Sequence, residues 1–296
     1  MGEKDLTEKQ LLELEDVFAD IVNVLLFDGK PLVQPEELQP AGKDSFYKDN
    51  DLKVRMQERD VAKLWIRENV RLAFFGLEDQ TVIDSAMPIR ILSYDAAVYR
   101  AALRERNERK IAEVVPFYPA ITLVLYFDYE KRWTSPRALK DCFKNIPPEL
   151  EPYISDYKIN VFEIAWLSDE TVSKFKSDFR FVANYYVQMR KTGNWIPMPG
   201  EVKHIKELFD LLSVVTSDTR FIEIYNSTKG EKTDMSSAAL DYWEKFYTDK
   251  GIARGKDMAM LKSIRSLMET LKLTAKQAMD ALRVPDEDRK RYDSQL

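Results

Sequence analysis

The chain has 296 residues, of which 45% are hydrophobic and 32% are charged, a balance that excludes collagen-like and wholly disordered classes. Its 45 Lys and Arg residues against 50 Asp and Glu residues give a net charge of −5, so any contact with nucleic acid requires a local basic patch. The single cysteine, Cys142, and the single histidine, His204, exclude an intramolecular disulfide, a cysteine-rich zinc site and chemistry that needs two histidines.

The N-terminal sequence and the longest apolar run bear on localisation. The first ten residues are too polar for a signal peptide, and the run at 120–127 is far shorter than the ~20 residues that span a bilayer. Together with the lone cysteine, these features predict a cytoplasmic protein with no membrane role.

The first half of the chain predicts a helix followed by a β-β-α unit. Apolar residues recur at three- and four-residue steps over 7–27, which predicts an amphipathic helix, and an exposed connection rich in Pro and Gly extends from there to 53. Residues 59–66 and 69–81 predict two strands joined by a turn at Asn69. A periodic run over 87–103 predicts a helix, with Pro88 in its first turn.

The second half predicts further strands and then helices. The apolar runs at 120–129 and 159–167 are typical of strands buried on both faces, and we expect both in the same sheet. Residues 168–190 predict a helix, and residues 202–282 predict several more, with one possible strand at 221–225. The chain is therefore expected to comprise an α/β domain over 1–200 and a helical C-terminal region over 201–296.

Candidate catalytic side chains lie on the two neighbouring strands of the β-β-α unit. Asp60 heads the first strand, and Glu78 and Gln80 end the second. Antiparallel pairing would bring Asp60 close to Glu78, and alternation along the strand places Glu78 and Gln80 on one face. Two carboxylates and an amide oxygen suit Mg²⁺, which keeps waters and takes contacts from a substrate phosphate. From the spacing alone, solvated charges at strand ends are the more frequent explanation.

This arrangement resembles the PD-(D/E)XK nuclease superfamily, whose αβββαβ core, with a mixed sheet, carries an Asp and a (D/E)-x-K motif on adjacent strands. More narrowly, the segments VFADIVNVLLFDGK, RDVAKLW, GLEDQTVIDSAMPIRILSYDAAVYR, ITLVLYFDYEKRW, SDYKINVFEIAWL and FKSDFRFVANYYVQMRK resemble the Rpn family of recombination-promoting nucleases, over roughly residues 13–225. The resemblance implies a Mg²⁺-dependent DNA endonuclease, with Mn²⁺ as an alternative metal, linked to recombination, mobile elements or phage defence.

The resemblance also implies roles for individual residues. The family's active site reads Asp, then Glu-x-Gln, which falls on Asp60, Glu78 and Gln80. Gln80 departs from the superfamily pattern, which has a Lys there, and an amide carries no charge to stabilise an attacking hydroxide. Lys63 lies on the opposite strand face, so Arg90 is the better candidate for a nearby positive charge.

Superfamily members often add a metal-binding carboxylate from the first helix. Asp16 and Asp20 are both candidates, and we rank Asp16 first as a metal ligand beside Asp60 and Glu78. Asp84 is more typical of a turn or N-cap before the helix that starts near Met87.

Arginines and the C-terminal tail predict binding partners. Arg100 and Arg104 share a helix face that could meet DNA phosphates, although the solvated end of a helix explains them at least as well. An apolar stripe in the tail suits self-association into a dimer or larger homo-oligomer, with packing on the parent domain as the alternative. The members of the stripe are Met258, Leu261, Ile264, Leu267, Met268 and Leu271. The alternative function is a catalytically weakened nucleic-acid-binding or regulatory oligomer that retains the nuclease fold.

Overall fold

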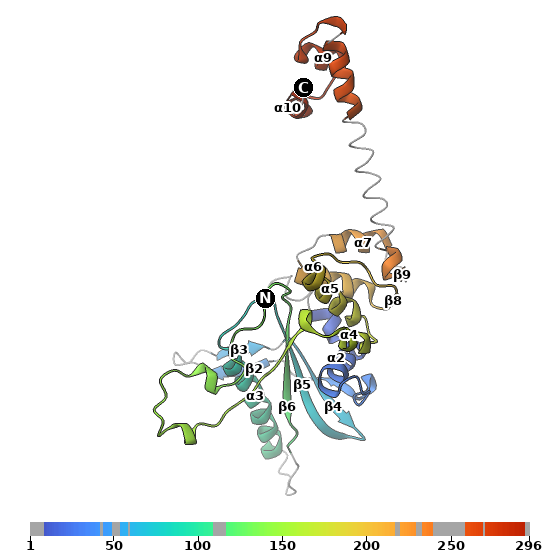
Figure 1. Cartoon of the computed structure of the whole chain (residues 1–296). Coiled ribbons are helices and arrows are strands. Elements are labelled where there is room, and N and C mark those ends of the chain that lie inside the picture. Colours follow the sequence, from blue (N-terminus) through green and yellow to red (C-terminus); the bar gives the residue numbers. More distant parts are fainter. Residues whose placement is uncertain are drawn as a thin grey trace. The chain divides into compact units, whose positions relative to one another are not determined.

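A computed structural model of the chain describes residues 9–41, 44–48, 54–58, 60–108, 117–216, 220–228, 233–238, 258–268 and 270–293. The chain separates into two compact units, Met1–Ser236 and Ser237–Leu296 (Figure 1). Across the described ranges, no helix is both long enough and apolar enough to cross a membrane.

A five-stranded mixed sheet organises the first unit, as the sequence predicts. Its strands lie in the order β1 (Leu38–Pro40), β4 (Val61–Arg67), β5 (Val70–Gln80), β6 (Ala120–Tyr126) and β7 (Asn160–Glu163). The pairs β1–β4 and β4–β5 are antiparallel, whereas β5–β6 and β6–β7 are parallel. Parallel neighbours need a crossover, and the helix α3 (Met87–Glu108) provides it between β5 and β6. The α/β class and the membership of β6 and β7 in one sheet are therefore confirmed.

Helices cover both faces of this sheet (Figure 1). On one face α3 contributes Met87, Ile91 and Tyr94 to a buried cluster with Val124 and Tyr126 of β6. This face includes Glu78, because Glu78 pairs with Val124 in the parallel register.

The opposite face is covered by α2 (Glu15–Phe27) and α5 (Phe179–Thr192). Phe27 packs on Trp65 of β4 at 6.5 Å between ring centroids, and Phe127 packs on Tyr186 of α5 at 5.3 Å. Burial on both sides explains why β5 and β6 read as nearly continuous apolar runs rather than alternating ones.

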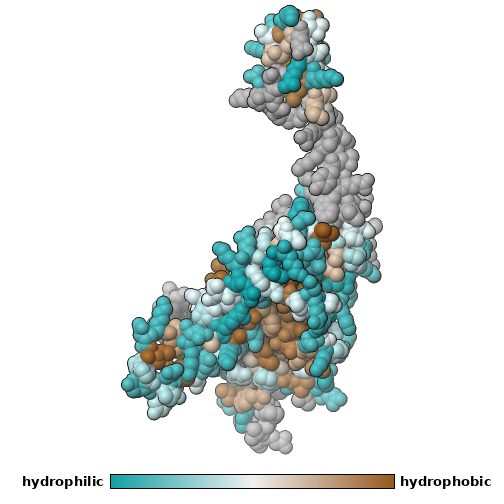
Figure 2. Space-filling view, viewed as in Figure 1, coloured by the Kyte–Doolittle hydropathy of each residue, from teal (hydrophilic) through white to brown (hydrophobic). Residues whose placement is uncertain are grey.

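Smaller elements complete the first unit. They are η1 (Pro35–Glu37), β2 (Asp44–Lys48), β3 (Val54–Glu58), η2 (Lys140–Cys142), η3 (Glu151–Tyr153), η4 (Ile164–Trp166), α4 (Asp169–Lys174), β8 (Glu201–Val202), α6 (Ile205–Thr216), α7 (Arg220–Thr228) and β9 (Thr233–Asp234). The segment between β6 and β7 exposes Phe143, Leu150 and Tyr153, and Figure 2 shows apolar atoms gathered on it at the left of the view.

The structure places α6 and α7 in the first unit, although the sequence pattern assigned them to a C-terminal region that starts at 201. Tyr185 of α5 packs on Phe221 of α7, and Phe221 packs in turn on Trp195 and on Phe209 of α6. This aromatic cluster packs α6 and α7 against α5, and the compact unit extends to Ser236.

Five element predictions need correction. The segment expected to be an exposed connection up to 53 contains η1, β1 and β2, and β3 follows it directly. The expected helix over 7–27 is interrupted at Leu14, whose extended backbone precedes α2. The expected helix over 168–190 is two helices, because the Asp20 carboxylate accepts the N–H groups of Lys176 and Ser177 between them. The strand expected over 159–167 has only the four residues of β7, since the chain continues into η4. The possible strand at 221–225 is helical and belongs to α7.

The second unit is a small helical assembly, as predicted for the tail. Its elements are helical residues 258–268 and 270–271, α9 (Ala275–Ala281) and α10 (Asp286–Asp293). Thr274 caps α9 in a capping box with Gln277. Ile264 of the predicted apolar stripe is fully buried and shares a cluster with Ala278 and Met279 of α9. The stripe therefore has a partner within its own unit, whereas the sequence pattern indicated only self-association or packing on the parent domain.

Candidate active site

The pairing of β4 and β5 places Asp60 beside Glu78. Val61 of β4 pairs with Leu77 of β5, so in an antiparallel register Asp60 lies at the level of Glu78. Asp60 directly precedes β4, and Glu78 lies near the end of β5. The strand geometry thus supports the proximity that the sequence predicted for these two residues.

Glu78 is a buried carboxylate held by an arginine. Its exposed fraction is 1%, and its Oε2 accepts a hydrogen bond from Nη2 of Arg90 at 3.3 Å. Arg90 comes from the first turns of α3, which packs over this face of the sheet. A buried carboxylate is costly unless it is paired, and Arg90 provides one such pairing.

Arg90 links Glu78 to two further side chains. Its Nη1 donates to Oδ2 of Asp84 at 2.9 Å, and its Nη2 donates to the hydroxyl of Tyr94 at 3.3 Å. Burial opposes the charge of Arg90, yet the hydrogen bonds to Asp84 and Tyr94 and the charge of Glu78 raise its pKa above the ordinary range. The guanidinium is therefore a fixed positive charge at this site.

Asp84 has the turn role that the sequence favoured, together with this ion pair. Its Oδ1 accepts the backbone N–H of Ala86 at 2.8 Å, just before α3 begins. Burial acts against ionisation, but the hydrogen bonds from Arg90 and Ala86 hold the pKa of Asp84 below its usual value.

The negative charges of both candidate carboxylates affect the pKa of Tyr94. Burial raises the pKa of Tyr94, and the negative charges of Glu78 and Asp60 raise it further. Both carboxylates thus act on one phenol on α3. The site therefore combines Asp60, Glu78, Asp84, Arg90 and Tyr94 at one end of β4 and β5.

Asp60 has a cationic partner that the sequence pattern did not reveal. Oδ1 of Asp60 lies 2.8 Å from Nζ of Lys9, and the two side chains are only 15% and 11% exposed. Lys9 lies in the short helical segment 9–13, before the break at Leu14. No local pattern links a lysine in the first helical segment to the start of a strand fifty residues later, so the sequence offered no signal for this contact.

Gln80 completes the predicted motif by strand alternation. It lies two residues after Glu78 on the same face of β5 and pairs with Tyr126 of β6 in the parallel register. Its backbone carbonyl accepts the N–H of Phe127 at 2.7 Å, which ties the end of β5 to the end of β6.

The donor set suits a hard divalent cation that needs few protein ligands. Within the described parts of the chain, no group of three or more His, Cys, Asp or Glu side chains is arranged to hold a metal ion. Asp60 and Glu78 supply two carboxylates, and the Gln80 amide can supply a third oxygen. Mg²⁺ is commonly bound by one or two carboxylates plus water and substrate phosphates, so these residues fit it.

Asp16 lies in a different environment from Glu78. It belongs to α2, which covers the opposite face of the sheet, and its Oδ2 lies 2.6 Å from Nζ of Lys203 and 3.0 Å from Nε2 of His204. Burial disfavours the ionised form of Asp16, but the hydrogen bonds from Lys203 and His204 outweigh this effect and lower the pKa of Asp16. The structure does not bring Asp16 together with Glu78, and its role as a metal ligand stays a prediction.

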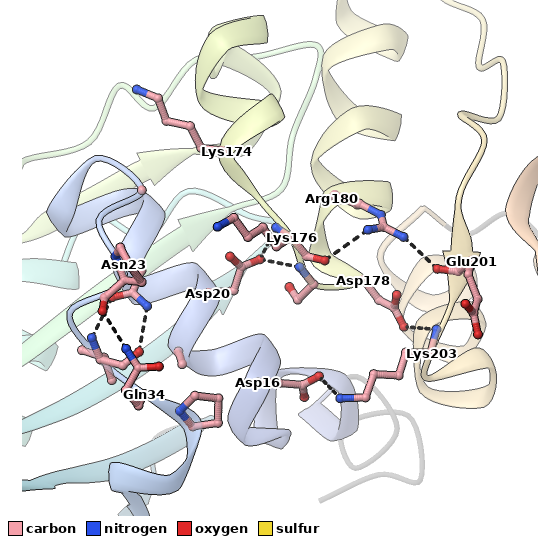
Figure 3. A pocket seen from close by; sticks show the side chains of 16 residues that line it. Asp16, Asp20, Asn23, Gln34, Lys174, Lys176, Asp178, Arg180, Glu201 and Lys203 are labelled. Carbon is pink, nitrogen blue, oxygen red and sulfur yellow. Dashed lines mark hydrogen bonds and ion pairs between the residues drawn. The ribbon is translucent and has the colours of Figure 1, made fainter.

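The surroundings of Asp16 form a polar cavity of about 610 Å³ between α2 and the start of α5 (Figure 3). Asp20, the other candidate from this helix, also lines this cavity, and its carboxylate accepts backbone N–H groups from the segment between α4 and α5. The Asp178 carboxylate likewise accepts hydrogen bonds from the backbone N–H groups of Lys203 and His204. These three carboxylates thus serve to join α2, α5 and α6.

The two arginines predicted to meet DNA are exposed on α3. Arg100 and Arg104 lie one helical turn apart, as the sequence indicated. At a rise of 1.5 Å per residue, Arg100 is about 15 Å along α3 from Arg90. Arg100 and Arg104 therefore lie apart from the carboxylates, and their contact with DNA stays a prediction.

Comparison with known proteins identifies the family. Residues 41–223 match the family model described as "Putative transposase, YhgA-like". No curated protein and no solved structure matches the chain. The matched segment includes Asp60, Glu78, Gln80 and the whole of α3, and it covers more than half of the sequence. The chain therefore belongs to the YhgA-like family of transposase- and nuclease-like proteins, within the PD-(D/E)XK nuclease-like Rpn/YhgA group.

Proposed function

We propose that this protein is a Mg²⁺-dependent DNA endonuclease that hydrolyses phosphodiester bonds, with Mn²⁺ as an alternative metal. The observation that carries the proposal is the pairing of β4 with β5, which places Asp60 beside the buried carboxylate of Glu78. Two carboxylates on adjacent strands, next to a fixed arginine, suit the binding of a cation and a phosphate together.

Each side chain has a distinct task in this reaction. Asp60 and Glu78 hold the cation, and Gln80 orients a ligand or a water through its amide. When bound, Mg²⁺ makes a water more acidic and offsets the charge that builds up on the phosphate. Hydrolysis consumes one water, forms a bond from its oxygen to phosphorus and breaks the bond from phosphorus to one sugar oxygen, which leaves as a hydroxyl.

Arg90 acts as a positioning residue. Its two terminal nitrogens hold Glu78, Asp84 and Tyr94 at 2.9–3.3 Å, so the Glu78 carboxylate keeps one orientation. Pre-organised ligands lower the cost of binding both metal and substrate, because fewer side-chain conformations are lost.

We further propose that Arg100 and Arg104 contact DNA phosphates away from the cutting site. The net charge of −5 gives the whole molecule no general attraction for DNA, so local cations are required. A homo-oligomer with two such sites would allow both strands to be cut, in keeping with a role in recombination, mobile elements or phage defence.

The deciding experiment is cleavage of supercoiled plasmid by the purified protein in Mg²⁺, Mn²⁺, Ca²⁺ or EDTA. Asp60→Asn and Glu78→Gln preserve side-chain shape while removing a metal-binding charge, and each is expected to lower divalent-dependent nicking by about 100-fold or more. Glu36→Gln makes the same chemical change at an exposed position on η1 and should cut like the wild type. Nicking that persists in both site variants at wild-type rates would rule out this assignment.

The second candidate is a nucleic-acid-binding oligomer without catalysis. Gln80 favours it, because the motif position that carries a charged lysine in the superfamily is neutral here. The same plasmid assay separates the two, since this candidate binds DNA yet leaves it uncut in every metal.

A further inference from the structure

Lys9 reaches the candidate active site from outside the segment that matches the family. Its ammonium lies 2.8 Å from Asp60, and its side chain is 11% exposed. Two neighbours, Leu11 and Leu12, have no exposed surface, so the helical segment 9–13 is anchored in the core. Lys9 is therefore held at the start of β4 by packing and not only by its charge.

We propose that Lys9 binds a phosphate oxygen of the nucleic-acid substrate at the Asp60–Glu78 site. This inference deepens the proposed endonuclease function and rests on it. Removing an ammonium from water is costly, and the ion pair with Asp60 offsets part of that cost. The result is a positive charge kept beside the carboxylates, where an anionic substrate must arrive.

Among the described residues, two other cations on β4 and α3, Arg90 and Lys63, have carboxylate partners of their own. The terminal nitrogens of Arg90 donate hydrogen bonds to Glu78, Asp84 and Tyr94. Lys63 lies on the opposite strand face, and its Nζ bonds Glu15 at 2.5 Å.

Lysine suits the task because its ammonium has three donors on a flexible stem. It can keep one hydrogen bond to Asp60 while another is directed to a phosphate oxygen. A carboxylate accepts several bonds through its two oxygens, so Asp60 can bond Lys9 and a cation together.

The local charges also favour this role. Among the described side chains that ion pairs join at this site, Asp60, Glu78 and Asp84 bring three negative charges against the single positive charge of Arg90. Without Lys9, this group of described side chains would present a phosphodiester with an excess of two negative charges. With Lys9 the excess falls to one, which a single divalent cation more than reverses.

The test measures DNA binding separately from cleavage. Fluorescence anisotropy of a labelled DNA duplex, in Ca²⁺ and over a series of KCl concentrations, compares the wild type with Lys9→Met, Lys9→Arg and Lys30→Met. The logarithm of the DNA-binding constant falls as the logarithm of the salt concentration rises. Loss of one phosphate contact in Lys9→Met should make this negative slope shallower by about 0.9. Lys9→Arg should keep the wild-type slope, as should Lys30→Met, because Lys30 is exposed in the loop after α2.

Plasmid cleavage provides the second readout. Lys9→Met should cut about 10- to 100-fold more slowly at saturating DNA, with rescue by Lys9→Arg. If Lys9→Met fails to fold, Lys9→Gln gives the same comparison.

Three results decide the inference. An unchanged salt slope in Lys9→Met overturns it. Equal loss of slope in the Met and Arg variants, together with a lower Tm in both, also overturns it, because the ion pair is then structural. If the wild type binds DNA but cuts it in no metal, the endonuclease proposal fails, whereas a slope reduced only in Lys9→Met still supports a phosphate contact.

Discussion

Arg90 is the side chain on which the geometry of the candidate site depends most. A planar guanidinium can hold Glu78, Asp84 and Tyr94 at once because its donors point in fixed directions. An ammonium in the same place has a single centre and cannot reproduce that fork. The arginine is therefore required by shape as well as by charge.

We predict that Arg90→Met lowers the free energy of unfolding by about 1.5–3 kcal/mol, because a buried carboxylate loses a charged hydrogen-bond partner. Arg90→Lys should recover only part of this loss. Urea unfolding followed by fluorescence measures both values. Arg100→Met, on the exposed side of the same helix, should change stability by less than about 0.5 kcal/mol. An Arg90→Met protein as stable as the wild type would contradict this account of Glu78.

At the residue scale, the sequence predicted the proximity of Asp60 and Glu78, which depends on strand geometry alone. Alternation and antiparallel pairing are local rules, and they are sufficient to place Asp60 near Glu78. The links from Arg90 to Glu78 and from Lys9 to Asp60 depend on how helices dock on the sheet. The docking of helices is determined by packing across the whole core, and no local sequence pattern around Arg90 or Lys9 indicates it.

At the scale of elements, a glutamate fastens the short edge strand β1 to the sheet. Glu37, at the end of η1, accepts hydrogen bonds from Nε1 of Trp65 at 2.8 Å and from Nε of Arg67 at 2.6 Å. The hydrogen bonds of Arg67 and then Trp65 lower the pKa of Glu37 to about 2. Its ionised form therefore stabilises the edge of the sheet where β1 pairs with β4.

We predict that this stabilisation depends on pH in one direction. The pKa is lower in the folded chain than the ordinary value near 4.5, so the contribution is complete above about pH 4.5 and is lost as pH falls toward 2. Glu37→Gln should lose about 1 kcal/mol at pH 7, and the difference from the wild type should shrink below pH 4.5. NMR titration of the Glu37 carboxyl carbon measures its pKa directly. A midpoint above pH 4 would contradict the prediction.

Some elements were foreseen and others were not, for identifiable reasons. The strands β5 and β6 carry continuous apolar runs with β-branched or aromatic residues, which are typical of buried strands. The strands β1, β2 and β3 were missed because they lie in a stretch with Pro and Gly residues and charges but no sustained apolar pattern. Residues 221–225 resembled a strand by composition, yet Phe221 and Ile224 are three residues apart and form the buried face of a helix.

At the scale of the whole molecule, each compact unit has a hydrophobic cluster of its own. The first unit buries side chains on both faces of the sheet, and the second buries Ile264, Ala278 and Met279 among its helices. Because the buried members of the apolar stripe are used inside the second unit, self-association through the stripe would rely on its exposed members. Met258 and Leu271 of the stripe remain 62% and 60% exposed.

We predict that a chain truncated after Ser236 keeps the fold of the first unit. Its near-ultraviolet circular dichroism should retain the signal of the aromatic cluster around Tyr185 and Phe221, and its main thermal transition should shift by no more than about 4 °C, the effect of roughly 1 kcal/mol in a domain of this size. Light scattering on both chains then tests assembly. A full-length oligomer that becomes a monomer on truncation would assign assembly to the second unit, and loss of cooperative unfolding in the truncated chain would show that the first unit does not fold independently.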